Sequence, residues 1–467
     1  MQEFLIHIVD TINTYLSDYV LVFMLLAIGL FYTIKTRFIQ VRCFGEGMRR
    51  VFGNLSLRGG KQERGMSSFQ ALATAIAAQV GTGNIVGASA AILTGGPGAI
   101  FWMWIIAFFG MATIYAEASL ALQTREVEKD GTVHGGPVYY ISRAFHGKFG
   151  KFLATFFAVT AALSLGFMGN LVQANAIGST MQTAFGIPAW IMGVILVVVC
   201  GIIFLGGVER LASVTEKIVP VMAGLFLLGG LGVLICRLSH LPQTFGMIFK
   251  YAFMPQAIIG GGVGAALKIA VSQGAKRGLF SNEAGMGSTP HAHAQANVKT
   301  PHEQGVVAMV GVFFDTFVVL TLNALVIIST LYTSDGILAS GVIPAGIDSG
   351  NLAQTAFGTV MGTKLGSMFV AVCLLFFALS TILSWNLFAK VNVHWLKPNG
   401  GKRVLTVFSI IALVFVFLGT VASNKLVWGL TDLFNNLMVI PNGLALFALS
   451  SMVVKHSKDP LPERIKQ

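Results

Sequence analysis

The segment 79–87, with the sequence QVGTGNIVG, places three glycines and three polar side chains in the middle of a long apolar, alanine-rich run. In hydrocarbon an unpaired backbone N–H or C=O group costs several kcal/mol, so a helix interrupted here must face a protein cavity or a bound species. The freed backbone groups, together with Gln79, Thr82 and Asn84, are suited to hold a cation and a small polar solute. The sequence therefore predicts a binding site at this interruption.

Two other interpretations account for less of this segment. A dinucleotide-binding loop needs G-x-G-x-x-G between a strand and a helix, whereas Gly87 comes one position late and lies inside a membrane span. Gly83 and Gly87 also form a GxxxG pair, which is typical of close helix packing. Packing does not explain the polar residues beside these glycines, so we interpret the segment as a functional interruption of a membrane helix.

The composition indicates a polytopic α-helical membrane protein. The chain has 467 residues, of which 55% are hydrophobic and 11% charged, with repeated apolar runs of about 20 residues, enough to cross a bilayer. The net charge of +12 comes from basic residues in short connections, where they set topology, so we expect no nucleic-acid partner. The four cysteines lack the spacing of a metal or redox motif and are expected to be packing residues.

We expect eleven transmembrane helices in one consistent orientation. The basic connection after the first span belongs in the cytoplasm, which places the N-terminus outside and the C-terminus in the cytoplasm of a plasma (bacterial inner) membrane. The expected spans are 19–34, 67–93, 99–122, 152–185, 188–205, 218–236, 257–285, 305–331, 365–391, 404–422 and 427–454.

Two of these spans are rich in glycine and occupy corresponding positions in the chain. The second, 257–285, carries Gly260 to Gly262, Gly264 and Ser272-Gln273-Gly274. This arrangement predicts two inverted five-helix repeats whose ligand sites lie near the middle of the membrane. The expected units are an extra N-terminal helix with its basic connection (1–66), the first repeat (67–236), the second repeat (257–422), and a last helix with a cytoplasmic tail (427–467).

Two acidic residues lie within apolar spans, where ionisable groups usually have a function. Glu117 is expected to brace a broken helix by accepting its backbone N–H groups, and a protonated Glu117 would allow proton coupling. For Asp315, a bound ion, a neighbouring polar helix and a proton are equally good explanations.

Polar side chains on two further spans are candidates for the same site. Asn170 and Gln173 share a helix face and can hold a solute without placing a charge in the membrane; hydrogen bonding between helices is the alternative. Thr381 and Trp385 also share a face, with an oxygen suited to Na⁺ and an indole able to limit side-chain size. The alternative is a lipid-facing Trp385 with Thr381 bonded to its own helix.

His291, His293 and the run Ser281-Asn282-Glu283 fall at an expected cytoplasmic end. Two histidines two residues apart could bind a metal ion, but no third ligand has a suitable spacing. We therefore expect these residues to be solvated.

Several motifs together resemble the alanine or glycine:cation symporter family. They are VGTGNI (80–85), TGGPG (94–98), Glu117, GGP (135–137) and above all RGLFSNEAG (277–285). The resemblance covers nearly the whole chain. It implies the leucine-transporter-type fold with one extra helix before the repeats, which agrees with the eleven spans.

The resemblance also implies roles for individual residues. Thr82 and Gly83 would meet the carboxylate of a small amino acid, Gln79, Asn170 and Gln273 its charged groups, and Thr381 and Trp385 would complete the pocket. The sodium site implied by the fold consists of the carbonyls of Ala77, Val80 and Ala378 with the hydroxyls of Ser380 or Thr381. Ile382 stands where a second hydroxyl is often found, which leaves Ser380 and the sodium stoichiometry open.

These observations predict a secondary active symporter for alanine, glycine or another small neutral amino acid, driven by Na⁺ by alternating access and using no cofactor. A proton-coupled symporter of the same fold is the alternative, and it would rely on Glu117 or Asp315. A channel would need a continuous polar pore, and an enzyme would need a nucleophile with its base or a set of metal ligands; the sequence indicates neither.

Overall fold

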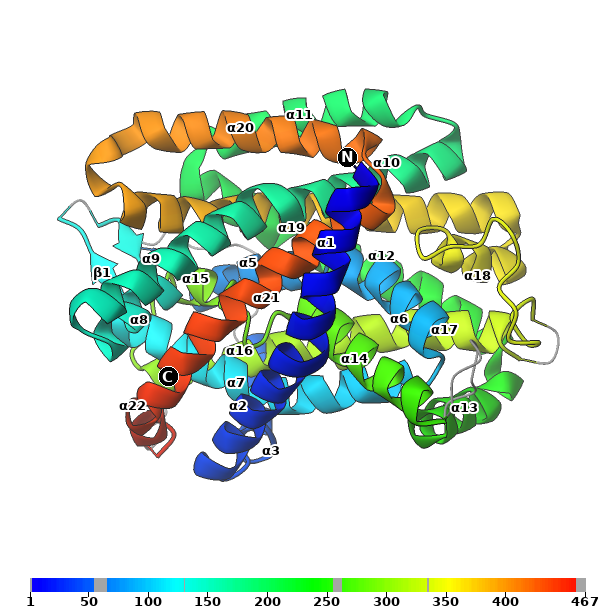
Figure 1. Ribbon diagram of the computed structural model, residues 1–467, viewed down its shortest axis with the longest axis horizontal. Helices are drawn as coiled ribbons and strands as arrows, with labels where there is room; N and C mark the ends of the chain where they lie inside the picture. Colours follow the sequence, from blue (N-terminus) through cyan, green and yellow to red (C-terminus); the bar gives the residue numbers. More distant parts are fainter. Residues whose placement is uncertain (1, 54–64, 130, 255–262, 334–335, 459–467) are drawn as a thin grey trace.

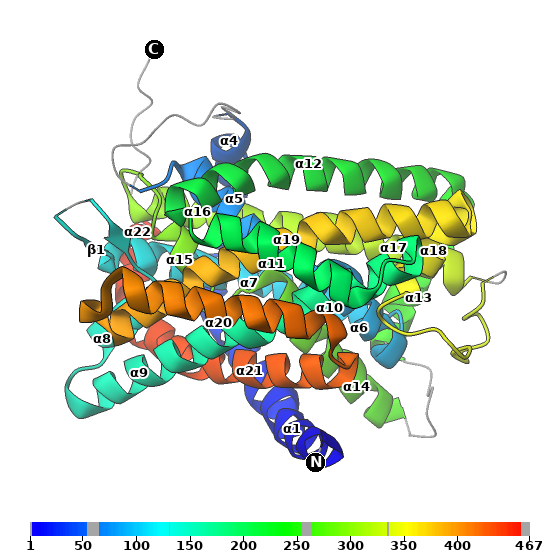
Figure 2. The same ribbon diagram turned by 90° about the horizontal axis from the view of Figure 1, so that it is seen from above.

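The computed structural model describes residues 2–53, 65–129, 131–254, 263–333 and 336–458. Most of the long helices run along the long axis of the molecule, and the N-terminal helices cross them obliquely (Figures 1 and 2). The hairpin β1–β2 and helix α8 lie at one end, and α13 and α18 lie at the other. Because the sequence predicts the first end to be cytoplasmic and the second to be external, the arrangement is consistent with a single orientation of the spans.

The first half of the chain contains the interrupted helix and the helices that pack on it. Its elements are α1 (Gln2–Tyr15), η1 (Leu16–Leu21), α2 (Val22–Lys35), α3 (Ile39–Arg42), α4 (Phe44–Gly53), α5 (Ser68–Gln79), η2 (Gly83–Gly87), α6 (Ala88–Gly95), α7 (Ala99–Thr124), β1 (Glu126–Val127), β2 (Val133–His134), α8 (Pro137–Ala144), α9 (Gly147–Leu163), η3 (Ser164–Met168), α10 (Gly169–Phe185), α11 (Ala189–Phe204) and α12 (Gly207–Cys236).

The helices of the second half are joined by turns and loops. Its elements are η4 (Leu238–His240), α13 (Leu241–Phe253), α14 (Val263–Asn282), α15 (Pro290–His293), α16 (Pro301–Val312), η5 (Phe313–Leu320), α17 (Thr321–Leu331), α18 (Leu352–Met361), α19 (Thr363–Leu396), η6 (Pro398–Gly400), α20 (Gly401–Val421), α21 (Asn424–Ala448) and α22 (Ser450–His456).

The described helices account for most of the expected membrane spans. Seven are long and apolar enough to cross a membrane, and nine spans result when each of two bent helix pairs is counted as one. Helix α11 is apolar but has only 16 residues, and α14 begins where the described chain resumes at 263. The chain is therefore a multi-pass helical protein, and the count of eleven spans stays a prediction.

The predicted interruption at 79–87 is present. Ser67 and Gln70 form a capping box that starts α5, and the helix ends at Gln79. The chain bends at Val80 and Gly81, and from Thr82 it continues through the π-helical segment η2 into α6 at an angle of 44°. Another π-helical segment, η5, lies in the span formed by α16 and α17. Such segments are frequent at functional sites because they displace side chains from the regular helical positions.

The second irregular segment differs from the prediction. Gly260, Gly261 and Gly262 lie outside the described residues, whereas Gly264 and Gly274 lie within the continuous helix α14. The irregular backbone instead follows α14: Glu283, Gly285 and Gly287 have φ angles of 59°, 92° and 83°. Gly274 therefore does not mark a break: it serves close packing, with its Cα facing Trp102 on α7.

Glycines also bring the first broken helix against α14. A Cβ at Gly83 would lie 2.8 Å from the Cα of Ser281, and one at Gly95 would lie 3.1 Å from the Cα of Ala270. Gly87, between them, faces Arg277. The two segments are therefore antiparallel and in close contact along η2 and α6, so the packing role considered for Gly83 and Gly87 coexists with the interruption.

The division into two repeats stays a prediction. The second unit, 257–422, contains only the spans formed by α14, by α16 with α17, by α19 and by α20. A second repeat of five membrane helices would have to include α21 as well.

Candidate functional site

Oxygen atoms from two elements meet where α5 ends. The carbonyl of Ala77 lies 3.2 Å from the Ser380 hydroxyl and 3.0 Å from the Thr381 hydroxyl, and Thr381 Oγ1 is also 3.2 Å from the carbonyl of Ala78. Ala77, Ser380 and Thr381 are fully buried. Three of the five candidate sodium ligands are thus brought together. Val80 and Ala378 lie buried in the same two elements, and the roles of their carbonyls stay predictions.

The turn after α5 is packed against both neighbouring elements. A Cβ at Gly81 would lie 2.4 Å from Thr381 Oγ1 and 3.2 Å from Gln173 Oε1. The N–H group of Thr82 donates to Gln173 Oε1 at 3.2 Å. Gly81 and Thr82 therefore lie between the α19 hydroxyls on one side and the Gln173 amide on the other.

Several polar atoms on the elements that meet at this turn are buried and unpaired. Among the described residues, Thr82 Oγ1, Gln79 Oε1 and Asn170 Oδ1 have no hydrogen-bond partner. Thr82 and Asn170 are 0% exposed and Gln79 is 1% exposed. Leaving a buried polar group unsatisfied costs about 1–3 kcal/mol, so a group of them marks a place suited to a polar ligand.

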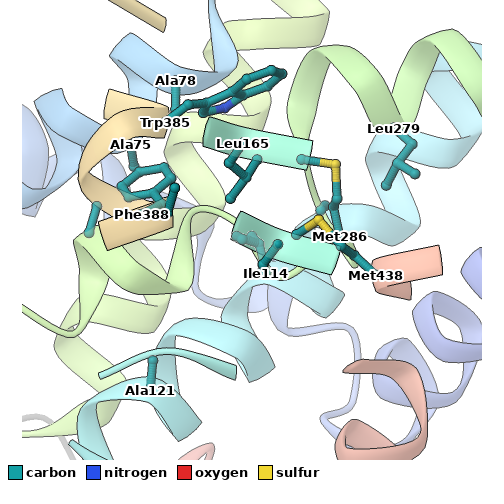
Figure 3. Close-up of a cluster of buried hydrophobic side chains, with 14 of the residues drawn as sticks. Ala75, Ala78, Ile114, Ala121, Leu165, Leu279, Met286, Trp385, Phe388 and Met438 are labelled. Atoms are coloured by element: carbon teal, nitrogen blue, oxygen red, sulfur yellow. The ribbon is translucent and has the colours of Figure 1, made fainter. Parts of the chain in front are cut away.

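Trp385, one turn beyond Thr381 on α19, is held in a single orientation. Its indole N–H donates to Glu283 Oε1 at 2.6 Å. Phe280 packs edge-on against its ring, with 5.9 Å between the ring centroids. A Cβ at Gly169 would lie only 1.9 Å from the Cζ3 atom of Trp385. Figure 3 shows the indole in the buried apolar cluster beside Ala78 and Leu165, so the lipid-facing alternative is wrong.

Glu283 combines a strained backbone with two side-chain contacts. Its φ of 59° is in the left-handed region, which costs a non-glycine residue on the order of 1–3 kcal/mol at such sites. One carboxylate oxygen accepts the Trp385 N–H and the other accepts the Ser288 hydroxyl. These contacts hold the turn in a fixed position relative to α19.

Asp315 connects both broken segments. Its carboxylate accepts hydrogen bonds from Asn84 Nδ2 at 2.6 Å, from the Ser281 hydroxyl at 2.9 Å and from the Thr316 hydroxyl at 2.8 Å. In a parallel contact, Gln79 Nε2 donates to the carbonyl of Asn282 at 2.8 Å. Of the three explanations considered for Asp315, the structure matches the neighbouring polar helix.

Glu117 braces the second irregular segment, as the sequence predicts. Its Oε2 accepts the N–H of Gly285 at 3.0 Å and its Oε1 accepts from Asn442 Nδ2 at 2.6 Å. Asn442 also donates to the carbonyl of Gly285 at 2.9 Å and accepts from the hydroxyl of Tyr140. Helices α7, α8 and α21 are thereby joined at the turn after α14.

We expect Glu117→Gln to destabilise the protein. A glutamine offers one acceptor where Asn442 and Gly285 both donate, so one buried donor loses its partner at a cost of about 1–3 kcal/mol. The measurement is the melting temperature of the purified protein in detergent. Glu209→Gln, an exposed position on α12, is the matched control and should leave the melting temperature unchanged. Equal melting temperatures for both variants would refute the bracing role.

One candidate substrate residue, Gln273, differs from expectation in its placement. The Cβ of Gln273 lies near Gly95, at the opposite end of α6 from the interruption, which separates it from the other candidates. The α14 residues that contact the interruption are Ser281 and Asn282, whereas the sequence predicts Gln273 there. Gly83 lies at the interruption, in close contact with Ser281.

The expectation of a solvated end at 281–293 is wrong. Ser281, Asn282 and Glu283 are 0% exposed, and His291 and His293 are 1% exposed. Burial lowers the pKa of His291 to about 4 and that of His293 to about 3, so both are neutral at neutral pH. His291 is held by Asn392, which lies far away in the chain, and His293 is held by Gln304 at the start of the next helix, α16.

The comparisons with known proteins agree on one family. The sequence profile of the sodium:alanine symporter family matches residues 2–466. This chain belongs to the sodium:alanine symporter family. It is 37% identical over 456 residues to the sodium/alanine symporter AgcS of Methanococcus maripaludis, covering 97% of this chain and 96% of that one. It is 38% identical over 460 residues to the probable sodium/glutamine symporter GlnT of Bacillus subtilis, covering 98% and 91%.

A solved structure supports the fold of the family. The structure of a Na⁺-coupled sialic acid symporter aligns with a TM-score of 0.53, covering 87% of this chain and 82% of that chain at 12% identity. At this identity the likeness concerns the fold alone. As a member of the sodium:alanine symporter family, the chain is a multi-pass membrane protein of cation-coupled amino-acid symport, in a family of transporters and not of enzymes.

Two residues near the site, Glu283 and Gly169, have no site role in the sequence-based prediction, and that prediction does not separate Gln173 from Asn170. Gln173 is the amide that contacts Thr82. The sequence shows that Asn170 and Gln173 share a helix face, but it does not show which of the two side chains contacts the interruption. Glu283 and Gly169 act through Trp385, and their proximity to it arises from tertiary packing.

Proposed function

We propose that this protein imports alanine, glycine or another small neutral amino acid together with Na⁺ across a plasma (bacterial inner) membrane by alternating access. The proposal rests mainly on one observation: Thr82, whose buried hydroxyl is unpaired, follows Gly81, and Gly81 lies against both Thr381 of the oxygen cluster and the Gln173 amide. One side of the interruption offers groups for a zwitterion, and the other offers oxygens for a hard cation.

Small substrates fit the surroundings of this site. The indole of Trp385 is fixed at its N–H by Glu283 and faces α10 at Gly169, so the ring has little freedom to move away from a larger side chain. Because a packed interior resists additional volume, a rigid aromatic wall favours substrates with short side chains.

A cavity on the predicted external side provides an entrance. It has a volume of about 370 Å³ and is lined in part by Asp10, Arg277, Trp428 and Asp432. Arg277 Nη1 lies 3.2 Å from Asp432 Oδ1, and the Cζ atom of Arg277 lies 4.4 Å from the ring centroid of Trp428. Phe280 packs between Trp428 and Trp385 and so separates the cavity from the central residues. Alternating access would require this aromatic layer and the ion pair to open.

We favour Na⁺ over H⁺ as the coupling ion. Both oxygens of Glu117 and both oxygens of Asp315 accept hydrogen bonds from donors, so each carboxylate is satisfied without a proton. The hydroxyl and carbonyl oxygens of the other cluster suit a monovalent cation that prefers oxygen ligands.

The experiment that tests this function is uptake of labelled alanine by proteoliposomes. An inward Na⁺ gradient should drive accumulation, and replacement of Na⁺ by K⁺ at constant pH should abolish it. Thr82→Ala should lower the uptake rate at least tenfold, because one good hydrogen bond to a charged group contributes about 1.5–3 kcal/mol. Thr11→Ala, an exposed position in α1, is the control and should transport normally. Accumulation that persists without Na⁺ but requires a proton gradient would establish the proton-coupled alternative instead.

A further inference from the structure

A set of three ligand-type side chains lies at the cytoplasmic end, away from the transport site. The Sγ of Cys43, a carboxylate oxygen of Glu46 and a ring nitrogen of His302 all lie within 4.8 Å of one another. His302 Nε2 is 3.3 Å from Glu46 Oε2. Cys43 and His302 are 8% and 4% exposed. We propose that these three residues form a binding site for Zn²⁺ or a similar borderline-soft divalent cation.

The separations between the ligand atoms suit a tetrahedral site. With Zn–N and Zn–O bonds of about 2.0–2.2 Å and Zn–S bonds of about 2.3 Å, neighbouring ligand atoms are about 3.3–3.6 Å apart. The distance between His302 Nε2 and Glu46 Oε2 already has this value. The sulfur needs only a small shift to complete three ligand positions, and a fourth position is left for water.

The groups around the three side chains orient them as ligands. His302 Nδ1 is bonded to the hydroxyl of Tyr115 at 2.8 Å, which directs Nε2 towards Glu46. Arg50 donates to Glu46 Oε1 at 2.8 Å, which leaves Oε2 for the ion. Partners of this kind fix the orientation of histidine and carboxylate ligands in metal sites.

The surrounding helices hold the site in place. Cys43 and Glu46 are three residues apart at the start of α4, so they project to one side of that helix. A Cβ at Gly47 would lie 2.6 Å from the carbonyl of Val306, one turn after His302 on α16. This glycine allows the close approach of α4 to α16 seen in Figure 2. A bound ion would fix the connection between α2 and α5 onto α16, and binding would release the thiol proton to solvent.

A second group, Glu128, His134 and His394, is less suitable for a metal ion. Both histidine Nε2 atoms face the same Glu128 oxygen, at 3.0 and 3.4 Å. However, the two rings stack in parallel with an interplanar angle of 6° and a centroid distance of 4.1 Å. Parallel rings cannot both place one ion in their planes, as metal coordination by imidazole requires.

The test is a Zn²⁺ titration of the reduced, purified full-length protein against a chromophoric chelator. Wild type should bind Zn²⁺, whereas Cys43→Ser and His302→Gln should lose this binding. Tyr115→Phe should weaken it by roughly 10- to 100-fold, the effect expected when a ligand loses its orienting partner. Cys236→Ser and His394→Gln are matched controls and should bind as wild type does.

The melting temperature provides an independent readout that does not depend on transport. Zn²⁺ should raise it in the wild type and the controls and leave it unchanged in Cys43→Ser, since a ligand stabilises only the state that binds it. Wild-type Zn²⁺ affinity in both Cys43→Ser and His302→Gln would overturn the proposal. Loss of binding in His394→Gln alone would overturn it in favour of the other group.

Discussion

Replacement of Gly81 by alanine should raise the apparent KM for Na⁺ by a factor on the order of 10 to 100. The added Cβ would lie 2.4 Å from Thr381 Oγ1, so the hydroxyl must leave the carbonyls of Ala77 and Ala78. Loss of one oxygen that holds a cation corresponds to about 1.5–3 kcal/mol. The measurement is the Na⁺ dependence of initial alanine uptake in proteoliposomes.

Two comparisons separate this effect from a general disturbance of the helix. Gly224→Ala on α12 adds the same methyl group where no atom lies within 4 Å, and it should transport normally. The double variant Gly81→Ala/Thr381→Ala removes the clash together with the hydroxyl. If the hydroxyl binds Na⁺, the double variant stays as poor as Thr381→Ala alone. An unchanged KM for Na⁺ in Gly81→Ala would mean that the cation binds elsewhere.

The second large effect is expected for Gly169→Ala, which should lower uptake of alanine at least tenfold. The new Cβ would lie 1.9 Å from Trp385 Cζ3 and 2.3 Å from its Cε3 atom. Glu283 and Phe280 hold the indole, so the ring can move only by breaking these contacts. Overpacking of this kind costs typically about 1–3 kcal/mol, here within the transport site.

A smaller ring should relieve the conflict. Gly169→Ala/Trp385→Phe removes the part of the indole that meets the new methyl group, so uptake should recover relative to Gly169→Ala. A panel of unlabelled amino acids competing with alanine should then show that larger side chains are accepted. Size-exclusion profiles establish that each variant is folded. Transport by Gly169→Ala at the rate of Gly224→Ala would contradict the role of Trp385 as a wall.

The local part of the site could be predicted from the sequence, because its signal is local. Polar residues and glycines within a few positions of Thr82 break the apolar pattern of a membrane helix, and this identifies the interruption. The bracing role of Glu117 could be predicted for the same reason, because a buried carboxylate needs hydrogen-bond donors. The helix spacing of Thr381 and Trp385 placed both on the face that meets α5 and α10.

The remaining parts depend on packing between distant segments. Gln273 is eight residues before Ser281, which corresponds to about 12 Å along a helix, and sequence alone did not show where α14 crosses the interruption. Gly264 and Gly274 suggested a break where α14 is continuous, whereas the chain turns at Glu283, a residue with no local preference for positive φ. The burial of His291 depends on Asn392, about one hundred positions later.

The contacts of Gln79 and Asn84 with the second irregular segment have a thermodynamic consequence. Gln79 bonds to Asn282, and Asn84 shares the Asp315 carboxylate with Ser281, so the ends of α5 and α14 are ordered together. A cation that orders the end of α5 therefore lowers the entropic cost of ordering the end of α14 around a bound amino acid. By linkage, the factor by which Na⁺ tightens amino-acid binding must equal the factor by which the amino acid tightens Na⁺ binding.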